Sequence, residues 1–394
     1  MKSIVYCSIR KICKIVSVFV HFFGYNSKTF GCPRGFHLTI NDFLESITDG
    51  SNKIKLGLIS STTIPKPLNF KRLNKFNNEY KYEESSIIIN NLFNCRFLYE
   101  PHALISSDDR IIFSESAAYG MNPNEHWIFR KFKLPKTLRL NGNSFMLGCI
   151  PNIWHLLMEE IPKLYRLQKA EIDINKFDYL IGRNLSLPQQ REVYEIFNIN
   201  VSKIVTFEKY KHIEFEKLTF FSPYYTPDID GIKWMKKKIL AYYNIKKVDP
   251  KRRLFISREN YNTKNIANFT VVKKVLKKYK FNIIQPENLT LRQQIIAFSE
   301  ADLIIGAHGA GLAANAIFCP DYGNVIEIRS ESHTHDFAAP YVCMWASKIN
   351  QMSHSILLSE TVKNKKLKGR TNTDSDFIVC PKELELLIQK HLDE

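Results

Sequence analysis

The feature that most constrains the fold is a regular alternation of short apolar runs and longer amphipathic runs over residues 252–328. The apolar runs predict strands at 252–257, 281–286, 302–306 and 323–328. The runs between them predict helices at 269–280, 290–301 and 311–318. Strands that alternate with helices pair in parallel, because each helix carries the chain back to the start of the sheet. This segment is therefore expected to form a Rossmann-like α/β domain.

The preceding part of the chain shows the same alternation in a weaker form. Residues 152–170 repeat apolar side chains at helical spacing, 177–182 predicts a buried strand, and 187–199 predicts the helix after it. Segments 85–100 and 103–116 predict strands separated by turns. Two α/β domains would enclose a cleft, which is where ligands bind in such folds.

The chain has 394 residues, enough for two domains with their own cores. We expect an N-terminal α/β domain over residues 1–232, with a β-rich part from about 40 to 140. A basic linker over 233–250 would lead to a C-terminal Rossmann-like domain over 251–380. A C-terminal helix over 381–394 would complete the chain.

The net charge of +17 favours an anionic partner. Nucleic acid, an anionic membrane surface and phosphorylated substrates all fit, and a solvated lysine-rich surface is the competing interpretation. The eight cysteines form no CxxC pair, which argues against a disulfide framework or a zinc ribbon and favours a reducing compartment.

An apolar stretch at 15–23 follows several basic residues, and it is too short to span a bilayer. Residues 1–30 could lie on an anionic membrane surface or pack as an ordinary first helix, and both interpretations stay open. We therefore expect a cytoplasmic protein, with peripheral contact to the inner membrane as the open alternative.

Small residues crowd around one histidine in "GAHGAGLAAN" at 306–315, directly after an expected strand. The helix start after such a strand attracts phosphate, and small residues let the backbone approach a ligand closely. The loop is neither a Walker A motif nor GxGxxG. It predicts anion binding by the backbone of Gly309, Ala310 and Gly311, with tight strand–helix packing as the alternative. His308 would contact a phosphate or sugar, or cap the local backbone.

Several segments together resemble glycosyltransferase family 61, in its bacterial-type, DUF563-like form. They are "SREN…KNIAN" (257–268), "LTLRQQIIAFSEADLIIGAHGAGLAANAIF" (289–318) and "NVIEI" (324–328). The segment 152–167 is similar to the family's Asn-x-x-His-x-x-x-acid helix followed by proline. The resemblance implies a GT-B architecture of two facing Rossmann-like domains with parallel sheets. The acceptor would lie on the side of the N-terminal domain, the nucleotide-sugar donor would bind to the C-terminal domain, and transfer would be inverting. The stretch around 264–269 has less arginine than the family pattern, and "AAN" after "HGAGL" lacks the usual Thr or Ser, which puts donor details in question.

Inverting transfer needs a base for the acceptor hydroxyl and positive or N–H groups for the departing diphosphate. His155 and Glu159 are four residues apart and so share a helix face. We expect Glu159 to be the base and His155 to orient acceptor or donor, with a structural ion pair as the alternative. Arg258 would grip the diphosphate with its bidentate fork, and Lys264 would add a second charge.

Three further side chains have an expected role or location. Glu327 would accept hydrogen bonds from a ribose or cap its strand, and Gln294 would hold the nucleotide base or the loop, or pack. Glu160, on a different helix face from Glu159, is expected in solvent.

We expect no metal and no cofactor besides the nucleotide-sugar co-substrate. The Asp-x-Asp triplets at 228–230 and 374–376 arise readily by chance, and 332–335 offers two histidines without a third ligand.

The sequence therefore favours an inverting, metal-independent glycosyltransferase that moves a hexose or pentose to a hydroxyl of a glycan or lipid-linked glycan. Family analogy points to bacterial surface polysaccharide, either capsule or lipopolysaccharide. A catalytically inactive sugar-nucleotide-binding homologue is the first alternative. A basic nucleic-acid-binding protein is the second, although no known binding module is evident. The oligomeric state, donor and acceptor stay open.

Overall fold

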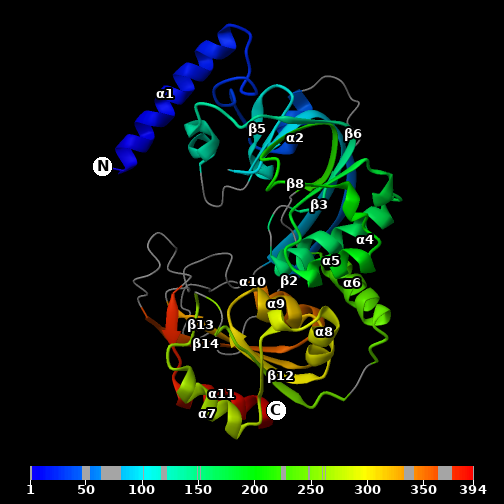
Figure 1. Cartoon of the computed structure of the whole chain (residues 1–394), viewed down its shortest axis with the longest axis vertical. Coiled ribbons are helices and arrows are strands. Elements are labelled where there is room, and N and C mark those ends of the chain that lie inside the picture. Colours follow the sequence, from blue (N-terminus) through cyan, green and yellow to red (C-terminus); the bar gives the residue numbers. More distant parts are fainter. Residues whose placement is uncertain are drawn as a thin grey trace.

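A computed structural model describes most of the chain. The described residues are 2–46, 54–63, 81–100, 102–116, 122–148, 150, 152–222, 228–246, 249–259, 261, 263–331, 341–362 and 375–393. They form an α/β protein with two sheets, one in the N-terminal half and one in the C-terminal half (Figure 1).

The N-terminal sheet has nine described strands in the order β1-β5-β4-β3-β9-β6-β7-β8, with β2 paired to β3. Their bounds are β1 Gly35–His37, β2 Ile54–Thr63, β3 Lys81–Leu98, β4 Ala103–Ile105, β5 Arg110–Ile112, β6 Leu138–Met146, β7 Tyr179–Gly182, β8 Ile204–Thr206 and β9 His212–Ser222. Strands β9, β6, β7 and β8 pair in parallel, whereas β3 is antiparallel to β2, β4 and β9. The links between β3, β4 and β5 are too short for a crossover, so this sheet is mixed rather than purely parallel.

Helices of the N-terminal half are α1 Lys2–Phe22, α2 Ile40–Ser46, α3 Ile153–His155, α4 Ile161–Lys169, α5 Pro188–Ile196 and α6 Ile229–Tyr242. Short 3-10 turns are η2 Phe113–Glu115, η3 Pro123–Glu125, η4 Trp127–Arg130, η6 Ile174–Lys176 and η7 Val201–Lys203. The helix expected over 152–170 is confirmed, with a π turn, η5 Leu156–Glu160, between α3 and α4.

Much of the expected linker is helical. Residues 233–242 belong to α6, because Ile232, Met235 and Ile239 recur at helical spacing and are fully buried. The basic side chains of this stretch occupy the remaining surface of the helix.

The C-terminal sheet confirms the alternation found in the sequence. Its order is β11-β10-β12-β13-β14-β15, parallel from β11 to β14, with β15 antiparallel at the edge. The bounds are β10 Arg252–Ile256, β11 Asn282–Ile284, β12 Ala301–Ala307, β13 Asn324–Ser330, β14 Ser353–Val362 and β15 Asp376–Ile378. The chain leaves β10 toward one edge and returns at β12 toward the other, so the strand order reverses between these two strands. Ligands of parallel sheets bind beside the carboxyl ends of strands at such a point.

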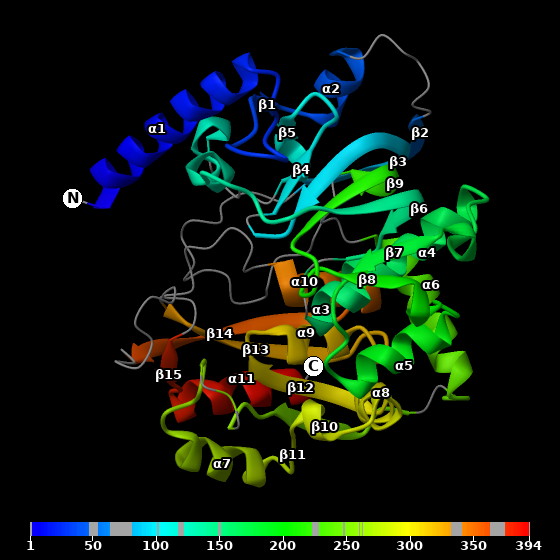
Figure 2. The same ribbon diagram turned by 45° about the horizontal axis from the view of Figure 1, so that its top comes forward.

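Helices cover both faces of this sheet (Figure 2). They are α7 Phe269–Lys278, α8 Leu291–Ser299, α9 Ala310–Ala316, α10 Tyr341–Asn350 and α11 Pro381–Asp393, with the 3-10 turn η8 Pro286–Asn288. Leu303 and Ile305 of β12 pack with the side chains of α7 and α11, while Ile304 between them packs with those of α8, α9 and α10. This alternation is the period of two expected for a strand buried on both sides.

The two halves share one apolar core, since α4 and α6 contribute to the same cluster as α8, α9 and α10. Polar contacts also cross between them. Lys236 Nζ donates to Cys319 O at 3.0 Å and to Asn350 Oδ1 at 2.8 Å, and Gln189 Nε2 donates to Leu289 O at 2.7 Å. The sheets are therefore held in one arrangement through the helices between them.

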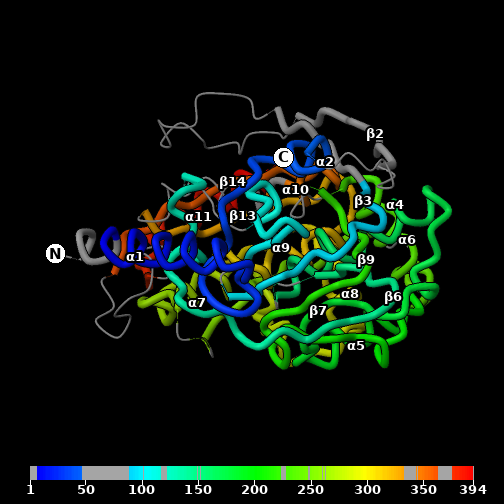
Figure 3. The backbone as a smooth tube through the Cα atoms, turned by 90° about the horizontal axis from the view of Figure 1, so that it is seen from above, coloured from blue at the N-terminus to red at the C-terminus, as the bar shows by residue number. Residues whose placement is uncertain are grey.

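Helix α1 lies at the opposite end of the N-terminal half from α4, α5 and α6 (Figure 3). None of the helices in the described ranges has the length and apolar character needed to cross a membrane. The cysteines in those ranges all carry free thiols.

Candidate functional site

The expected anion site forms where the C-terminal sheet reverses its strand order. Arg258 follows β10 and the loop from His308 to Gly311 follows β12, so parallel pairing brings them together. A Cβ atom at Gly309 would lie 3.0 Å from Arg258 Nη1, and Gly309 has a φ of 159°, a backbone conformation that side chains disfavour. Glycine at this position therefore lets the guanidinium approach the loop backbone.

A cavity of about 220 Å³ opens beside this loop. Its lining includes Arg258 and Glu259 from the end of β10, Lys264 and Asn265 from the next loop, and Ala307 from the end of β12. The Arg258 guanidinium also lies 4.5 Å from the centre of the Tyr261 ring. Two cationic side chains thus line one cavity at the end of β10, which is an arrangement suited to a diphosphate.

His308 directly follows Ala307 of the cavity lining, and its side chain is buried and bonded to Glu327. Its Nδ1 contacts Glu327 Oε1, and its backbone N donates to Ile328 O at 2.9 Å. Burial and the nearby Arg329 guanidinium lower the pKa of His308 to about 4, against the opposing effect of Glu327. The imidazole is neutral at physiological pH, and because its Nδ1 faces an ionised carboxylate, Nδ1 carries the proton. Nε2 is then the acceptor nitrogen, which suits a sugar or ribose hydroxyl better than a phosphate oxygen.

Glu327 is the centre of a buried charge network. Its side chain is 0% exposed. Arg329 Nε and Nη2 lie 2.9 Å from Oε1, and His354 Nε2 lies 2.9 Å from Oε2. Burial alone would raise the pKa of Glu327, but Arg329 and the hydrogen bonds from His308 and His354 hold this pKa well below its usual range. The Glu327 carboxylate therefore orients the imidazole of His308. Because it is fully buried, it has no oxygen available to a ribose.

Among the described residues, Glu327, Cys343 and His354 form a group whose ligand atoms all lie within 4.8 Å of one another. Burial raises the pKa of the Cys343 thiol well above its ordinary value, and the carboxylate of Glu327 adds to this effect. Arg329 already bonds Oε1 of Glu327 and His354 already bonds Oε2, so both carboxylate oxygens have partners within the protein. The group fits a hydrogen-bonded network better than a metal site.

His155 and Glu159 form a pair across one helical turn. His155 Nδ1 lies 2.7 Å from Glu159 Oε2, and the two side chains are 21% and 7% exposed. The pair spans the π turn η5, a local irregularity that is frequent at functional sites. Because the His155 side chain is the more exposed of the two, the imidazole is the group that a ligand would contact.

The helix that carries His155 contacts the C-terminal half of the protein. Helix α3, which carries His155, packs against α9, the helix that begins after Gly309. The two motifs are about 150 residues apart in the sequence. This contact between the halves sets the imidazole–carboxylate pair on a helix that packs against α9, the helix that follows the glycine loop.

The prediction that Glu160 is solvated is wrong. Its side chain is 2% exposed, and its Oε2 lies 3.3 Å from both Arg183 Nη2 and the Tyr194 hydroxyl. Burial raises the pKa of Glu160, although the Arg183 guanidinium opposes this. The carboxylate fits only because Gly148 has no side chain, since a Cβ there would lie 1.9 Å from Glu160 Oε1. Glu160 thus anchors the π turn from inside.

Gln294 lies away from the cavity lining. Its side chain is buried, and Nε2 donates to Pro286 O at 2.7 Å and to Leu289 O at 3.1 Å, which supports the packing interpretation. Asp228 of the first Asp-x-Asp triplet caps α6 and pairs with Arg166 Nε at 2.5 Å. In the second triplet Asp376 accepts from Asn265 N at 2.8 Å, while Asp374 and residues 332–335 lie outside the described part of the chain.

Part of the chain matches a protein-family model. Residues 148–326, just under half of the chain, match the family model described as Glycosyltransferase 61. The match supports glycosyltransferase family 61. It spans His155, Glu159, Arg258 and the loop from His308 to Gly311, and it ends one residue before Glu327. No curated protein matches the chain.

Sequence reasoning missed Arg329, His354 and Cys343, the partners of Glu327. Arg329 follows Glu327 by two residues on β13, so strand periodicity places both on one face and could have indicated it. His354 and Cys343 come from β14 and α10, which pack beside β13 only in the folded chain.

The low pKa of His308 predicts a pH-dependent stability. A histidine that stays neutral when folded contributes fully above its unfolded pKa of about 6.5. This contribution is lost as the pH falls toward the folded value of about 4, because only the unfolded chain takes up the proton. We expect the free energy of unfolding, measured with urea, to exceed that of His308→Asn most at pH 7.5 and progressively less down to pH 4. A difference that stays constant over this range contradicts the prediction.

Proposed function

We propose that the protein is an inverting glycosyltransferase that transfers a sugar from a nucleotide-sugar donor to a hydroxyl of a glycan acceptor. The observation that carries this proposal is the cavity lined by Arg258 and Lys264, with Arg258 against Gly309 and the helix of His155 packed on α9, which follows that glycine. The family match supports the transferase class.

The roles follow from position and charge. Arg258, Lys264 and the first backbone N–H groups of α9 bind the diphosphate and stabilise its growing charge as it leaves. His308, oriented by Glu327, accepts a hydrogen bond from a sugar or ribose hydroxyl.

We assign the base to His155, with Glu159 as its orienting partner, because the imidazole is the more exposed of the two. His155 Nε2 accepts the proton of the acceptor hydroxyl as that oxygen bonds to the anomeric carbon. The carbon–oxygen bond to the diphosphate breaks on the opposite side, so the anomeric configuration inverts and the nucleoside diphosphate departs. Both positive side chains come from the protein, so the proposed reaction uses no metal.

The two sheets with a site between them are consistent with a GT-B arrangement, which we propose in a modified form with a mixed N-terminal sheet. The lysine-rich surface fits an anionic donor and a lipid-linked acceptor, and by family analogy we propose a role in bacterial surface polysaccharide synthesis.

The donor site is tested by thermal unfolding of purified protein with a panel of nucleoside diphosphates and nucleotide sugars. A ligand that binds only the folded state stabilises it by about 2.7 kcal/mol at a hundredfold excess over its dissociation constant. Arg258→Ala removes charge-assisted hydrogen bonds of about 1.5–3 kcal/mol, so we expect at least tenfold weaker binding.

Arg252→Ala is the matched control, because Arg252 lies at the other end of the same strand in an exposed ion pair with Glu300 at 2.9 Å. It should bind the donor as the wild type does. If no nucleotide stabilises the wild type but nucleic acid does so in a salt-sensitive way, the transferase proposal fails. Binding without transfer to any acceptor would instead favour the inactive homologue.

A further inference from the structure

Helix α1 presents its apolar face outward. The exposed fractions of five large apolar side chains on one face range from 50% to 82%: Ile12, Ile15, Val18, Phe19 and Phe22. Figures 1 and 2 show α1 at the outer edge of the N-terminal half, with this helix set apart from both sheets. Ordinary surface helices bury such a face and expose the polar one.

The opposite face of α1 docks on the protein through both apolar and polar contacts, and it includes the buried Cys13 and the partly buried Ile9. Ser17 Oγ donates to Cys32 O at 2.5 Å, and His21 Nε2 lies 3.3 Å from Asp109 Oδ2. Toward the other end, Lys14 Nζ donates to Asn124 Oδ1 at 3.1 Å. These contacts, made by residues 14, 17 and 21, lie on the inner side of the helix. Turning the exposed apolar face of α1 inward would therefore break them.

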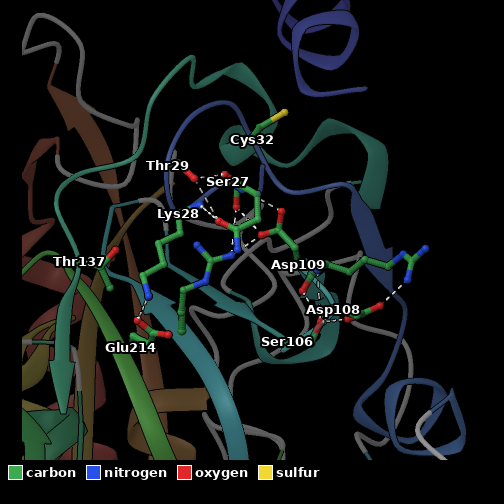
Figure 4. Close-up of polar contacts among 12 residues, drawn as sticks. Ser27, Lys28, Thr29, Cys32, Ser106, Asp108, Asp109, Thr137 and Glu214 are labelled. Carbon is green, nitrogen blue, oxygen red and sulfur yellow. Dashed lines mark hydrogen bonds and ion pairs between the residues drawn. The ribbon is translucent and has the colours of Figure 1, made fainter. Parts of the chain in front are cut away.

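The anchor of this contact is a buried polar cluster around Asp109 (Figure 4). Asp109 is 4% exposed; it accepts from Ser27 N at 2.9 Å and from Ser27 Oγ at 2.5 Å, and it pairs with Arg96 of β3. Breaking a buried ion pair of this kind is strongly unfavourable. The cluster therefore holds the loop after α1, and with it the helix, in one orientation.

The surroundings of the outer face are basic and aromatic. Residues 1–41 contain six Lys or Arg and no Asp or Glu. Beyond the helix, Phe23, Tyr25 and Phe30 are also exposed. A second copy of this segment would bring like charges together, whereas an anionic lipid surface complements both the charge and the apolar side chains.

We propose that the outer face of α1 docks onto an anionic lipid surface, with the helix lying in the interface rather than crossing it. The phenyl rings would enter the boundary between headgroups and acyl chains, and the exposed basic residues Lys11 and Arg34 would face the lipid phosphates. The protein would then be held at the membrane surface. This inference does not depend on the proposed transferase activity.

The test is co-sedimentation of the full-length protein with vesicles of phosphatidylglycerol and phosphatidylcholine, and with vesicles of phosphatidylcholine alone. We expect binding to the anionic vesicles that weakens as salt increases. The double variant Phe19→Ser/Phe22→Ser should bind them at least about 100-fold more weakly, because two buried rings are lost. The control Tyr322→Ser/Leu386→Ser removes two apolar side chains that are 73% and 64% exposed elsewhere, and it should bind as the wild type does.

Three results would overturn the proposal. The wild-type protein could fail to bind anionic vesicles, or the Phe19→Ser/Phe22→Ser variant could bind them as strongly as the wild type does. Light scattering could also show a wild-type dimer that is a monomer in this variant, which would assign the face to a second copy of the chain. Circular dichroism and nucleotide-dependent thermal shifts of the variant establish that its fold and donor site are intact.

Discussion

Replacement of His155 by glutamine is expected to lower kcat by about 10²–10⁴-fold, the usual contribution of a general base. The dissociation constant of the donor should change little, because the diphosphate contacts belong to Arg258 and the loop after β12. The assay is sugar transfer with the donor identified by thermal unfolding, and donor affinity is measured separately by calorimetry. Glu159→Gln should lower kcat less, since it leaves the imidazole in place without its ionised partner.

The order of the two effects distinguishes the roles. If Glu159→Gln is the more damaging substitution, the carboxylate is the base and His155 orients a substrate. His102→Gln is the matched control, because His102 lies in the turn between β3 and β4 of the N-terminal sheet, away from η5. Full activity of both His155→Gln and Glu159→Gln would remove this pair from the mechanism.

Replacement of Glu327 by glutamine is expected to lower the free energy of unfolding by about 3–5 kcal/mol, because it leaves a buried charge without its partner. Arg329 is 2% exposed and has Glu327 Oε1 at 2.9 Å. His308 and His354 also lose their ionised acceptor. Urea unfolding followed by fluorescence measures the change.

The matched control is Glu100→Gln, which removes an exposed carboxylate that lies 3.0 Å from Lys211. An exposed pair contributes at most about 1 kcal/mol, so this variant should unfold almost as the wild type does. A metal-chelating agent separates the two interpretations of Glu327, Cys343 and His354. If it destabilises the wild type as much as Glu327→Gln does, this group holds a metal. We expect no effect of the chelator.

Most of the secondary structure of the C-terminal half could be predicted from the sequence. The strands and helices from β10 to β13 lie within a few residues of the expected ranges, because local periodicity records which sides of an element are buried. The first hundred residues and the region after 330 were harder to predict, because antiparallel pairing and the return of β14 to β13 depend on segments distant in the sequence.

Some features of the candidate site could also be predicted from the sequence, and others could not. The glycine at 309 was identified from the loop motif, and its position after β12 followed from the strand alternation. Whether Glu160 lies in solvent or in the core depends on Arg183 and on the space at Gly148, and neither is a neighbour in the sequence. The exposure of His155 relative to Glu159 likewise depends on which helix packs over them.

The sequence by itself determined a parallel α/β half, a small-residue loop at the end of a strand, and an imidazole and a carboxylate on one helix face. These features are local, since they follow from periodicity and from the shape of single residues. The tertiary structure decided that α3 meets α9, that Glu327 is buried among three partners, and that α1 faces outward with its apolar side. Burial and charge pairing are set by groups far apart in the chain, so only the folded arrangement determines which side chains are buried with a partner and which are left exposed.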